Sequence, residues 1–390
     1  MCGKEKYAAH WQEYWSARTA NAVRRRLMLI LNMHSVIINQ LNMKEKCGGA
    51  ARKGGIMVKI TAGENDAGQR FDRFLRKYLK NAPLSVIYRI IRKDAKLNGK
   101  RVHRETELAA DDEITLYISD DDFAKFTEKK NTSGPPVRRT FRIIYEDDNI
   151  IVVNKPAGLL IHGNASEKRN TLVNQVTDYL IQKGEYSPRV EKTFSPAAVN
   201  RLDRNTSGLV MFGKNAQSLR ALASMIRQRC CVEKHYIAIV RGEYAGPGIL
   251  TGTITKDEKN NRVAVGDDAG SGRAIETHID VVSSADEVSL LDIELVTGRT
   301  HQIRAHLAYA GYPLAGDAKY GDETFNRRMR RDFGINGQFL HAWRLTVKKA
   351  ESPLGYLAGR TFISELPKQG RLTAEALFGN DWEKIYAGNI

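Results

Sequence analysis

The most constraining feature of the sequence is a charged stretch that leads straight into an apolar run. Asp203 lies between Arg201 and Arg204, and residues 209–212 are all apolar. Such a run is typical of a buried strand, and residues 206–208 are typical of a turn that leads into it. We therefore expect Asp203 in a loop before a sheet, where an ionised carboxylate can act as a nucleophile or a base. A structural salt bridge is the alternative that this motif alone leaves open.

Net charge is the feature of the composition that bears on function. The 390 residues include 61 Lys and Arg against 45 Asp and Glu, a formal net charge of +16. This excess favours a polyanionic partner, most simply nucleic acid. A solvated surface with a basic bias is the alternative. The length allows two or three domains with an ample core.

Cysteines and histidines give no sign of a metal site. Cys2, Cys47, Cys230 and Cys231 form no C-x-x-C pair, which favours a reduced, cytoplasmic setting. His301 and His306 are five residues apart, a spacing that does not put two ligands on one helical face. The apolar stretch over residues 27–41 is interrupted by polar residues, so no membrane span is expected. We expect no metal and no cofactor.

Changes in composition divide the chain. Residues 1–56 carry ten Lys and Arg against three Asp and Glu and end in a glycine-rich run. We expect a basic extension that is disordered or partly helical, with Met57 a possible true start. A small module follows over residues 57–120, then a polar linker over residues 121–139. The catalytic domain is expected over residues 140–366 and a partly helical tail over residues 367–390.

The small module shows two short helical patterns and a hairpin. Apolar residues over 71–79 recur on one helical face, and Ser85 is expected to cap a second helix. Basic residues lie off both apolar faces, and Asn98-Gly99 predicts a tight hairpin turn. These features suit contacts with an RNA backbone. An ordinary helix pair with solvated basic faces is the alternative.

Two further clusters lie in the second domain. Tyr236 follows Lys234 and His235 in a predicted strand, where its ring could stack on a base or serve as an ordinary sheet aromatic. In residues 297–307, Thr300 or a neighbour is expected to cap a helix, and Arg304 is interpreted as the counter-ion of a buried carboxylate. The turn-rich loop 311–321 is expected to wall the same cleft. No glycine-rich phosphate loop is present.

Predicted strands occur both in consecutive runs and in alternation with helices. This order favours an α+β fold with a mixed, mostly antiparallel sheet flanked by helices, rather than a doubly wound fold. Taken together and in order, four motifs of the second domain resemble the RluA family of RNA pseudouridine synthases, over residues 140–366. The motifs cover residues 154–158, 200–208, 234–236 and 297–306. Asn200 departs from the family, which often has His before Arg-Leu-Asp. Because Asn keeps a hydrogen-bonding side chain, we interpret it as a subfamily feature.

The small module resembles the S4 RNA-binding domain in residues 69–75, 90–93 and 97–102. By that resemblance, the chain is similar to the branch of the family that acts on large-subunit ribosomal RNA. The RNA-facing side chains that this resemblance implies are Arg70, Arg73, Arg89, Arg92, Lys93 and Lys100.

The family resemblance implies the chemistry. Asp203 would be the nucleophile, with the attacked atom, ribose C1′ or uracil C6, left open. Arg304 would keep Asp203 ionised, and Tyr236 would stack on the base and could assist proton removal from C5. The base would be extruded from its stack. The implied substrate-binding residues are Arg201, Arg204, Thr206, Lys155, Arg299, His301 and Gln302.

The resemblance also implies a binding partner, and two alternative functions stay open. The expected substrate is a set of uridines in 23S ribosomal RNA, bound by a cytoplasmic monomer without cofactor or metal. A noncatalytic RNA-binding or ribosome-assembly factor would need the charge and the small module but not Asp203, Tyr236 and Arg304 together. An aspartate-dependent glycosylase would release free base. The identity of the modified uridines, and whether free RNA or a precursor particle is the substrate, stay open.

Overall fold

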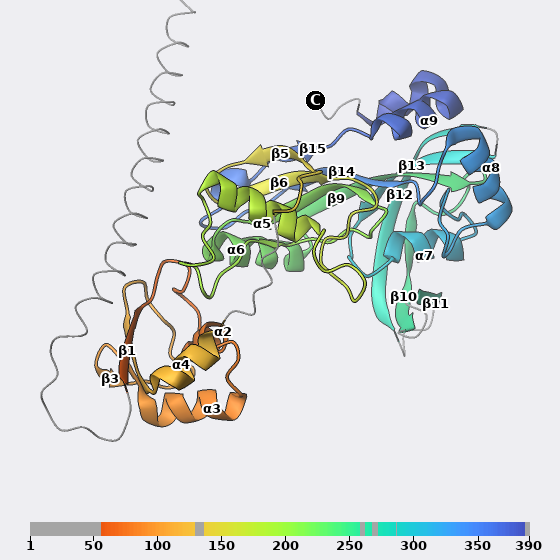
Figure 1. Ribbon diagram of the computed structural model, residues 1–390. Coiled ribbons are helices and arrows are strands. Elements are labelled where there is room, and N and C mark those ends of the chain that lie inside the picture. Colours follow the sequence, from red (N-terminus) through yellow and green to blue (C-terminus); the bar gives the residue numbers. More distant parts are fainter. Residues whose placement is uncertain (1–55, 129–135, 258–261, 267–271, 286, 387–390) are drawn as a thin grey trace, which may run out of the picture.

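The computed structural model describes residues 56–128, 136–257, 262–266, 272–285 and 287–386, which form a small unit (56–128) and a large unit (136–386) (Figure 1). The expected N-terminal extension lies outside the described residues, apart from Ile56. None of the helices within these ranges is long and apolar enough to cross a lipid bilayer.

The small unit packs two helices and a helical turn against a sheet with strand order β1-β4-β2-β3. Its core contains Phe71, Phe74, Ile87 and Ile114. Helix α3 begins at Leu84 after Pro83 rather than being capped by Ser85, because Pro83 takes the N-cap position. The elements are β1 (Ile56–Thr61), α2 (Phe71–Tyr78), α3 (Leu84–Arg89), η1 (Ile90–Asp94), β2 (Ala95–Leu97), β3 (Lys100–Arg101) and β4 (Glu113–Ile118).

A further helix of the small unit corrects the predicted linker. Helix α4 (Asp120–Thr127) begins after Ser119, whose side chain accepts a hydrogen bond from the Asp122 amide. Phe126 is buried in the core of the small unit and Phe123 packs against it. The predicted polar linker over residues 121–139 is wrong for residues 121–127, because two aromatic side chains on one helical face suffice to anchor a short helix. Residues 129–135 lie outside the described ranges.

The large unit is built on one sheet, whose strand order within the described residues is β11-β10-β12-β13-β9-β14-β8-β6-β5, with β15 beside β14 and β7 beside β8. Every pairing is antiparallel except that of β8 with β14, so the predicted mixed, mostly antiparallel sheet is confirmed. The strands are β5 (Arg142–Glu146), β6 (Ile150–Lys155), β7 (Ala197–Ala198), β8 (Ser207–Gly213), β9 (Val232–Arg241), β10 (Ile249–Asp257), β11 (Arg262–Gly266), β12 (Arg273–Ala285), β13 (Val288–Leu295), β14 (Leu340–Val347) and β15 (Thr361–Ile363).

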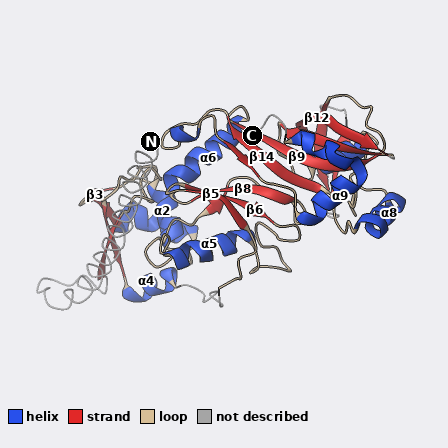
Figure 2. Cartoon of the chain, turned by 90° about the horizontal axis from the view of Figure 1, so that it is seen from above, coloured by secondary structure: helices blue, strands red, loops and turns tan. Residues whose placement is uncertain are grey.

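Helices cover both faces of this sheet. Helices α5 (Leu172–Lys183) and α6 (Ala216–Gln228) lie on opposite sides of the β5–β6–β8 end (Figure 2). Successive residues of a strand point to opposite faces, so Ile151 packs with α5 and Ile150 with α6. Helix α7 (Gln302–Tyr309) shares the core cluster of α5. This places α5 and α7 over one continuous apolar face of the sheet.

The two halves of the sheet meet at a narrow seam. Strands β8 and β14 pair through two residue pairs, Ser207 with His341 and Gly208 with Ala342. Gly208 has a φ of +114°, and a Cβ atom there would lie 2.2 Å from the Ala342 carbonyl oxygen. A side chain would therefore force the two backbones apart. The loop that carries Asp203 ends at this seam.

The C-terminal segment is part of the large unit rather than a tail. Helix α9 (Lys368–Phe378) and the turn η3 (Gly379–Ile385) bury Ala374, Phe378 and Trp382 in the cluster that also holds Trp343 of β14. Helix α8 (Glu323–Phe333) packs on the same cluster. The boundary at residue 366 is therefore wrong, because residues after it complete this core.

The small unit contacts the start of α6. Asn65 accepts a hydrogen bond from the Ala216 amide at 2.7 Å, and Arg220 donates one to the Ala67 carbonyl at 3.1 Å. Gln69 donates to the Thr193 hydroxyl at 3.3 Å. These contacts are polar, in contrast to the apolar cores of the units themselves.

Candidate active site

Asp203 lies in the loop before β8, as its sequence context predicts. Its neighbour Leu202 is buried in the core shared with α5 and α7. The Asp203 carbonyl accepts a hydrogen bond from the Thr206 amide at 3.1 Å. These two contacts fix the loop, while the Asp203 side chain remains 17% exposed. The carboxylate is thus held in place but reachable from solvent.

Arg304 pairs with Asp203, as predicted. Its Nη1 donates to Asp203 Oδ2 at 2.8 Å. The other edge of the guanidinium donates to Asp317, from Nε at 2.7 Å and from Nη2 at 2.8 Å. Arg304 is therefore a buried cation that bridges two carboxylates. Its bidentate pair with Asp317 fixes the plane of the guanidinium.

Asp317 was missed as a site residue, although its loop was expected to wall the cleft. Burial favours its protonated form, but the Arg304 hydrogen bonds and charge outweigh burial and lower the pKa of Asp317. For Arg304, burial opposes the charge, and the two carboxylates more than offset it and raise its pKa. The Lys319 amide also donates to Asp317, at 2.8 Å. Both groups of this pair stay ionised near neutral pH.

His301 and Tyr320 lie next to the ion pair of Asp203 with Arg304. His301 Nδ1 lies 3.0 Å from the Tyr320 hydroxyl, and its Nε2 lies 3.9 Å from Asp203 Oδ2. Burial is the main cause that lowers the pKa of His301. The Tyr320 ring centroid lies 5.3 Å from the Arg304 guanidinium carbon, within cation–π range. Tyr320 was not predicted, and only its place in the 311–321 loop pointed to it.

The start of α7 differs from the prediction. The N-cap is His301, in the left-handed region with a φ of 55° and without a side-chain cap. Instead the Gln302 side chain accepts hydrogen bonds from the Arg299 amide and the Thr297 hydroxyl, at 3.0 and 2.9 Å. This local bonding holds the turn that points His301 toward Asp203.

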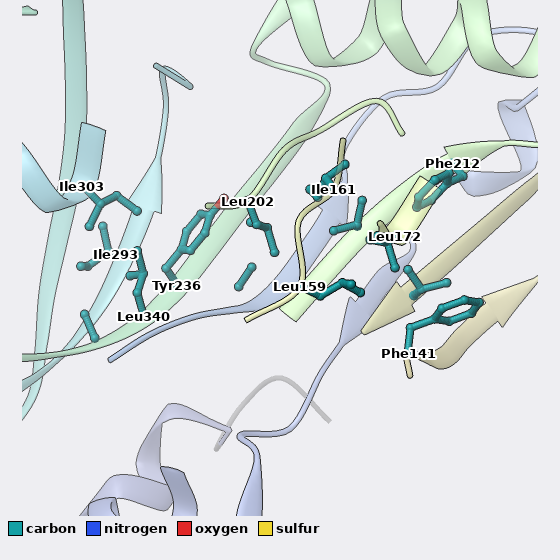
Figure 3. Close-up of a cluster of buried hydrophobic side chains, with 14 of the residues drawn as sticks. Phe141, Leu159, Ile161, Leu172, Leu202, Phe212, Tyr236, Ile293, Ile303 and Leu340 are labelled. Carbon is teal, nitrogen blue, oxygen red and sulfur yellow. The ribbon is translucent and has the colours of Figure 1, made fainter. Parts of the chain in front are cut away.

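Tyr236 forms the apolar floor beside the carboxylate. Figure 3 shows its ring among Leu202, Ile293, Ile303 and Leu340. Burial, and to a lesser degree the charge of Asp203, raises the pKa of the Tyr236 hydroxyl. The phenol therefore stays protonated at neutral pH, which disfavours its use as a proton acceptor.

Three residues that were expected to bind substrate are buried within the protein. Lys155 is fully buried, and its Nζ donates to the carbonyls of Pro156, Leu159 and Arg204 at 2.9–3.0 Å. Burial lowers its pKa to about 7. Thr206 and Gln302 are each 2% exposed and hydrogen-bonded internally. Through these internal bonds the three residues shape the loops that carry Asp203 and Arg304, and their predicted contact with substrate stays a prediction.

The remaining predicted cations lie at or near the surface. Arg201 and Arg204 are exposed on either side of Asp203. Arg299 has a buried Nε without a hydrogen-bond partner among the described residues. In the small unit Arg73, Arg89, Arg92, Lys93 and Lys100 are exposed. Arg70 is instead held in an ion pair with Asp72 at 3.0 Å. Within the described ranges, no group of three or more His, Cys, Asp or Glu could hold a metal ion.

The geometry agrees with what the chain is similar to. Residues 149–309 match the family model described as RNA pseudouridylate synthase. "Ribosomal large subunit pseudouridine synthase C" of Vibrio vulnificus is 36% identical over 300 residues, which cover 75% of this chain and 89% of that protein. The protein of the same name from Escherichia coli K12 is 35% identical over 299 residues, 73% of this chain and 86% of that protein. Among solved structures, "Human RNA Pseudouridylate Synthase Domain Containing 4" matches with a TM-score of 0.47 and 20% identity, over 60% of this chain and 91% of that one. The chain belongs to the RluA family of RNA pseudouridine synthases and is an isomerase that acts on uridine in RNA.

Proposed function

We propose that the protein converts specific uridines of 23S ribosomal RNA to pseudouridine. The relatives that share most of its length are named for large-subunit ribosomal RNA. The observation that carries the proposal is the ion cluster Asp203–Arg304–Asp317, because a binding factor has no use for a partly exposed carboxylate fixed by a buried arginine.

Asp203 is the nucleophile in this proposal. Its pairing with Arg304 at 2.8 Å supports the role, since a fixed cation favours the ionised carboxylate and holds its angle of attack. The C1′–N1 bond breaks, the uracil turns, and a C1′–C5 bond forms. The proton on C5 is lost and N1 gains one, so the reaction neither consumes nor releases any other molecule.

Tyr236 and the two flanking arginines hold the substrate in this proposal. The Tyr236 ring belongs to the apolar floor next to Asp203, a suitable surface for a uracil ring. Arg201 and Arg204 are exposed beside the carboxylate and can bind phosphates or fill the space that the extruded uridine leaves. Arg299 and His301 lie near the turn before α7 and would contact the same nucleotide.

The small unit is an S4-like RNA-binding domain in this proposal. Its exposed cations on α3 and η1 support contacts with the RNA backbone. Arg70 contributes less, because Asp72 already neutralises it. The enzyme is a monomer in this proposal, and its rRNA substrate favours a cytoplasmic setting.

Pseudouridine mapping of large-subunit rRNA tests this proposal. Carbodiimide modification and primer extension would be applied to RNA from cells that lack the gene, complemented with wild type or with Asp203→Asn. We expect specific stops that only wild type restores. If every stop persists without the gene, the substrate is another RNA. Release of free uracil in place of pseudouridine would instead identify a glycosylase.

A further inference from the structure

A cavity of about 320 Å³ lies beside the catalytic loop. Its lining includes Pro156, Gly158, Leu160, Glu167, Asn170 and Arg204. Neither Asp203 nor Tyr236 lines it, so it is separate from the place where the uridine reacts. Arg204 lines this cavity and also lies at the reaction site, because it directly follows Asp203 in the chain. The volume is at the lower end of the range of about 300–1,000 Å³ that is usual for small-ligand sites.

The wall at Glu167 carries a carboxylate that is held in a fixed position. Oε1 of Glu167 accepts hydrogen bonds from the amides of Arg169 at 3.1 Å and Asn170 at 2.9 Å. These backbone hydrogen bonds lower the pKa of Glu167. An ionised carboxylate repels phosphate, so the surface at Glu167 itself does not suit the RNA backbone. It suits N–H donors on the edge of a base.

The neighbouring Asn170 supplies a donor. Its Oδ1 accepts a hydrogen bond from the Gln175 side chain at 3.0 Å, which orients the amide group. Gln175 is itself fixed, because its carbonyl oxygen accepts from the Thr140 amide at 2.8 Å. The amide nitrogen of Asn170 is thus the end available to a ligand. The cavity wall therefore offers an acceptor at Glu167 next to a donor at Asn170.

This pattern matches one base better than the others. The Watson–Crick edge of guanine presents N1–H and the N2 amino group as adjacent donors, with the O6 acceptor beside them. Adenine and cytosine each present a ring acceptor next to their amino group, and uracil has a single N–H donor between two carbonyls. Only guanine gives a carboxylate two neighbouring donors and leaves a carbonyl for an amide N–H.

We propose that this cavity binds a guanine of the RNA substrate that is unstacked close to the target uridine. Glu167 accepts from N1–H and N2–H₂, and Asn170 donates to O6. Arg204 lines the cavity beside them, where its Nε donates to the Gly158 carbonyl at 3.0 Å. Sequence-specific recognition of RNA targets unstacked bases of this kind. The inference rests on the proposed function, since it takes RNA as the substrate, and it adds a sequence requirement near the modified uridine.

The test replaces single guanines by inosine, which lacks the N2 amino group but keeps N1–H and O6. Short RNAs would be made around a uridine that wild type converts, with each guanine within a few nucleotides replaced in turn, and pseudouridine formation would be timed. For wild type we expect kcat/KM to fall about tenfold at one position. Glu167→Gln should lower kcat/KM on the guanine RNA and reduce the guanine-to-inosine ratio at that position to about one.

Glu167→Gln is a conservative probe, because a Gln carbonyl can still accept the two backbone hydrogen bonds. Glu375→Gln is the matched control, an exposed carboxylate on α9 away from the cavity, and should keep the wild-type ratio. Equal ratios for wild type and Glu167→Gln at every position would overturn the proposal, as would a wild type that is indifferent to all guanines. If rRNA from cells that lack the gene keeps every pseudouridine, the proposed function itself fails, so the two failures are distinguishable.

Discussion

Arg304 in the large unit and Arg92 in the small unit carry the same charge in opposite surroundings. The Arg304 side chain is 8% exposed and is bound by two carboxylates, whereas Arg92 lies exposed on the turn that follows α3. The effect of a buried cation depends on the exact position of its partners, since removing one partner leaves an uncompensated charge. An exposed cation acts through its electrostatic field, and salt screens that field. The large unit should therefore respond to single atoms, and the small unit to the number of charges and to ionic strength.

The largest effect is expected from Asp203→Asn. This change keeps the shape of the side chain and removes the proposed nucleophile, so we expect pseudouridine formation to fall about a thousandfold or more. Tritium release from RNA labelled at uridine C5 measures it. Asp381→Asn, in an exposed pair with Lys384, is the control and should keep full activity. Substantial activity in Asp203→Asn would remove the basis for the contrast between the units.

Asp317→Asn is expected to have the next largest effect. Arg304 would keep one hydrogen-bond acceptor there but lose a charged partner, so we expect the free energy of unfolding to fall by about 3 kcal/mol. With Arg304 less firmly held, kcat should fall about a hundredfold. Urea denaturation and single-turnover kinetics measure the two effects.

The matched control for Asp317 is Asp332→Asn, which breaks an exposed pair with Arg331. Surface pairs contribute little, so we expect no measurable change in stability or rate. If both variants behaved alike, burial of the ion pair would not be what distinguishes the catalytic arginine.

The same contrast applies to histidines and gives a pH prediction. His341 is buried between the Ser207 hydroxyl at 2.8 Å and the Ser364 carbonyl at 2.9 Å, and burial lowers its pKa to about 4. Between pH 6.5 and about 4 the unfolded chain binds a proton that the folded chain excludes. Stability should therefore fall as the pH falls through this window, by up to about 3 kcal/mol.

His341→Gln should make this pH dependence shallower, because the proton-binding group is gone. His103→Gln, on the exposed surface of the small unit, should leave it unchanged. Urea titrations at several pH values measure the slope. An identical slope in His341→Gln and wild type would show that other groups cause the loss of stability in acid.

The smallest effect is expected in the small unit. Replacing Arg89, Arg92 and Lys93 together by Ala should raise KM about tenfold and leave kcat unchanged, because these side chains are far in sequence from the reacting atoms and exposed. The slope of log affinity against log salt concentration should become shallower by roughly two to three. A matched triple change of Lys348, Arg371 and Lys384, all exposed in the large unit, should do less. A fall in kcat would instead tie the small unit to catalysis.

Local patterns predicted the catalytic loop well. The apolar run 209–212 became β8, which is buried along its whole length, and the ion pair of Asp203 with Arg304 is present. The position of a surface loop can be predicted from sequence when its charged residues directly precede an apolar run, because the run must be buried and the charges must not.

Sequence did not reveal which polar side chains are satisfied inside the protein. Lys155, Thr206 and Gln302 are polar residues of the family motifs, yet each bonds to backbone or buried side chains. Asp317 was missed for the converse reason. Its burial depends on Arg304 from another element, and nothing in a Gly-Asp loop indicates that its carboxylate faces inward.

The seam between β8 and β14 bears on how the protein is made. Asp203 and Arg304 are 101 residues apart, and β14, which joins the halves of the sheet, comes later still. At synthesis rates of roughly 5–20 residues per second, Arg304 is added roughly 5–20 s after Asp203. A nascent chain that has completed β8 holds Asp203, the proposed nucleophile, without its counter-ion. Enzymatic competence thus arises late, in one step, when the last strands close the sheet, and turnover is a reporter of finished folding.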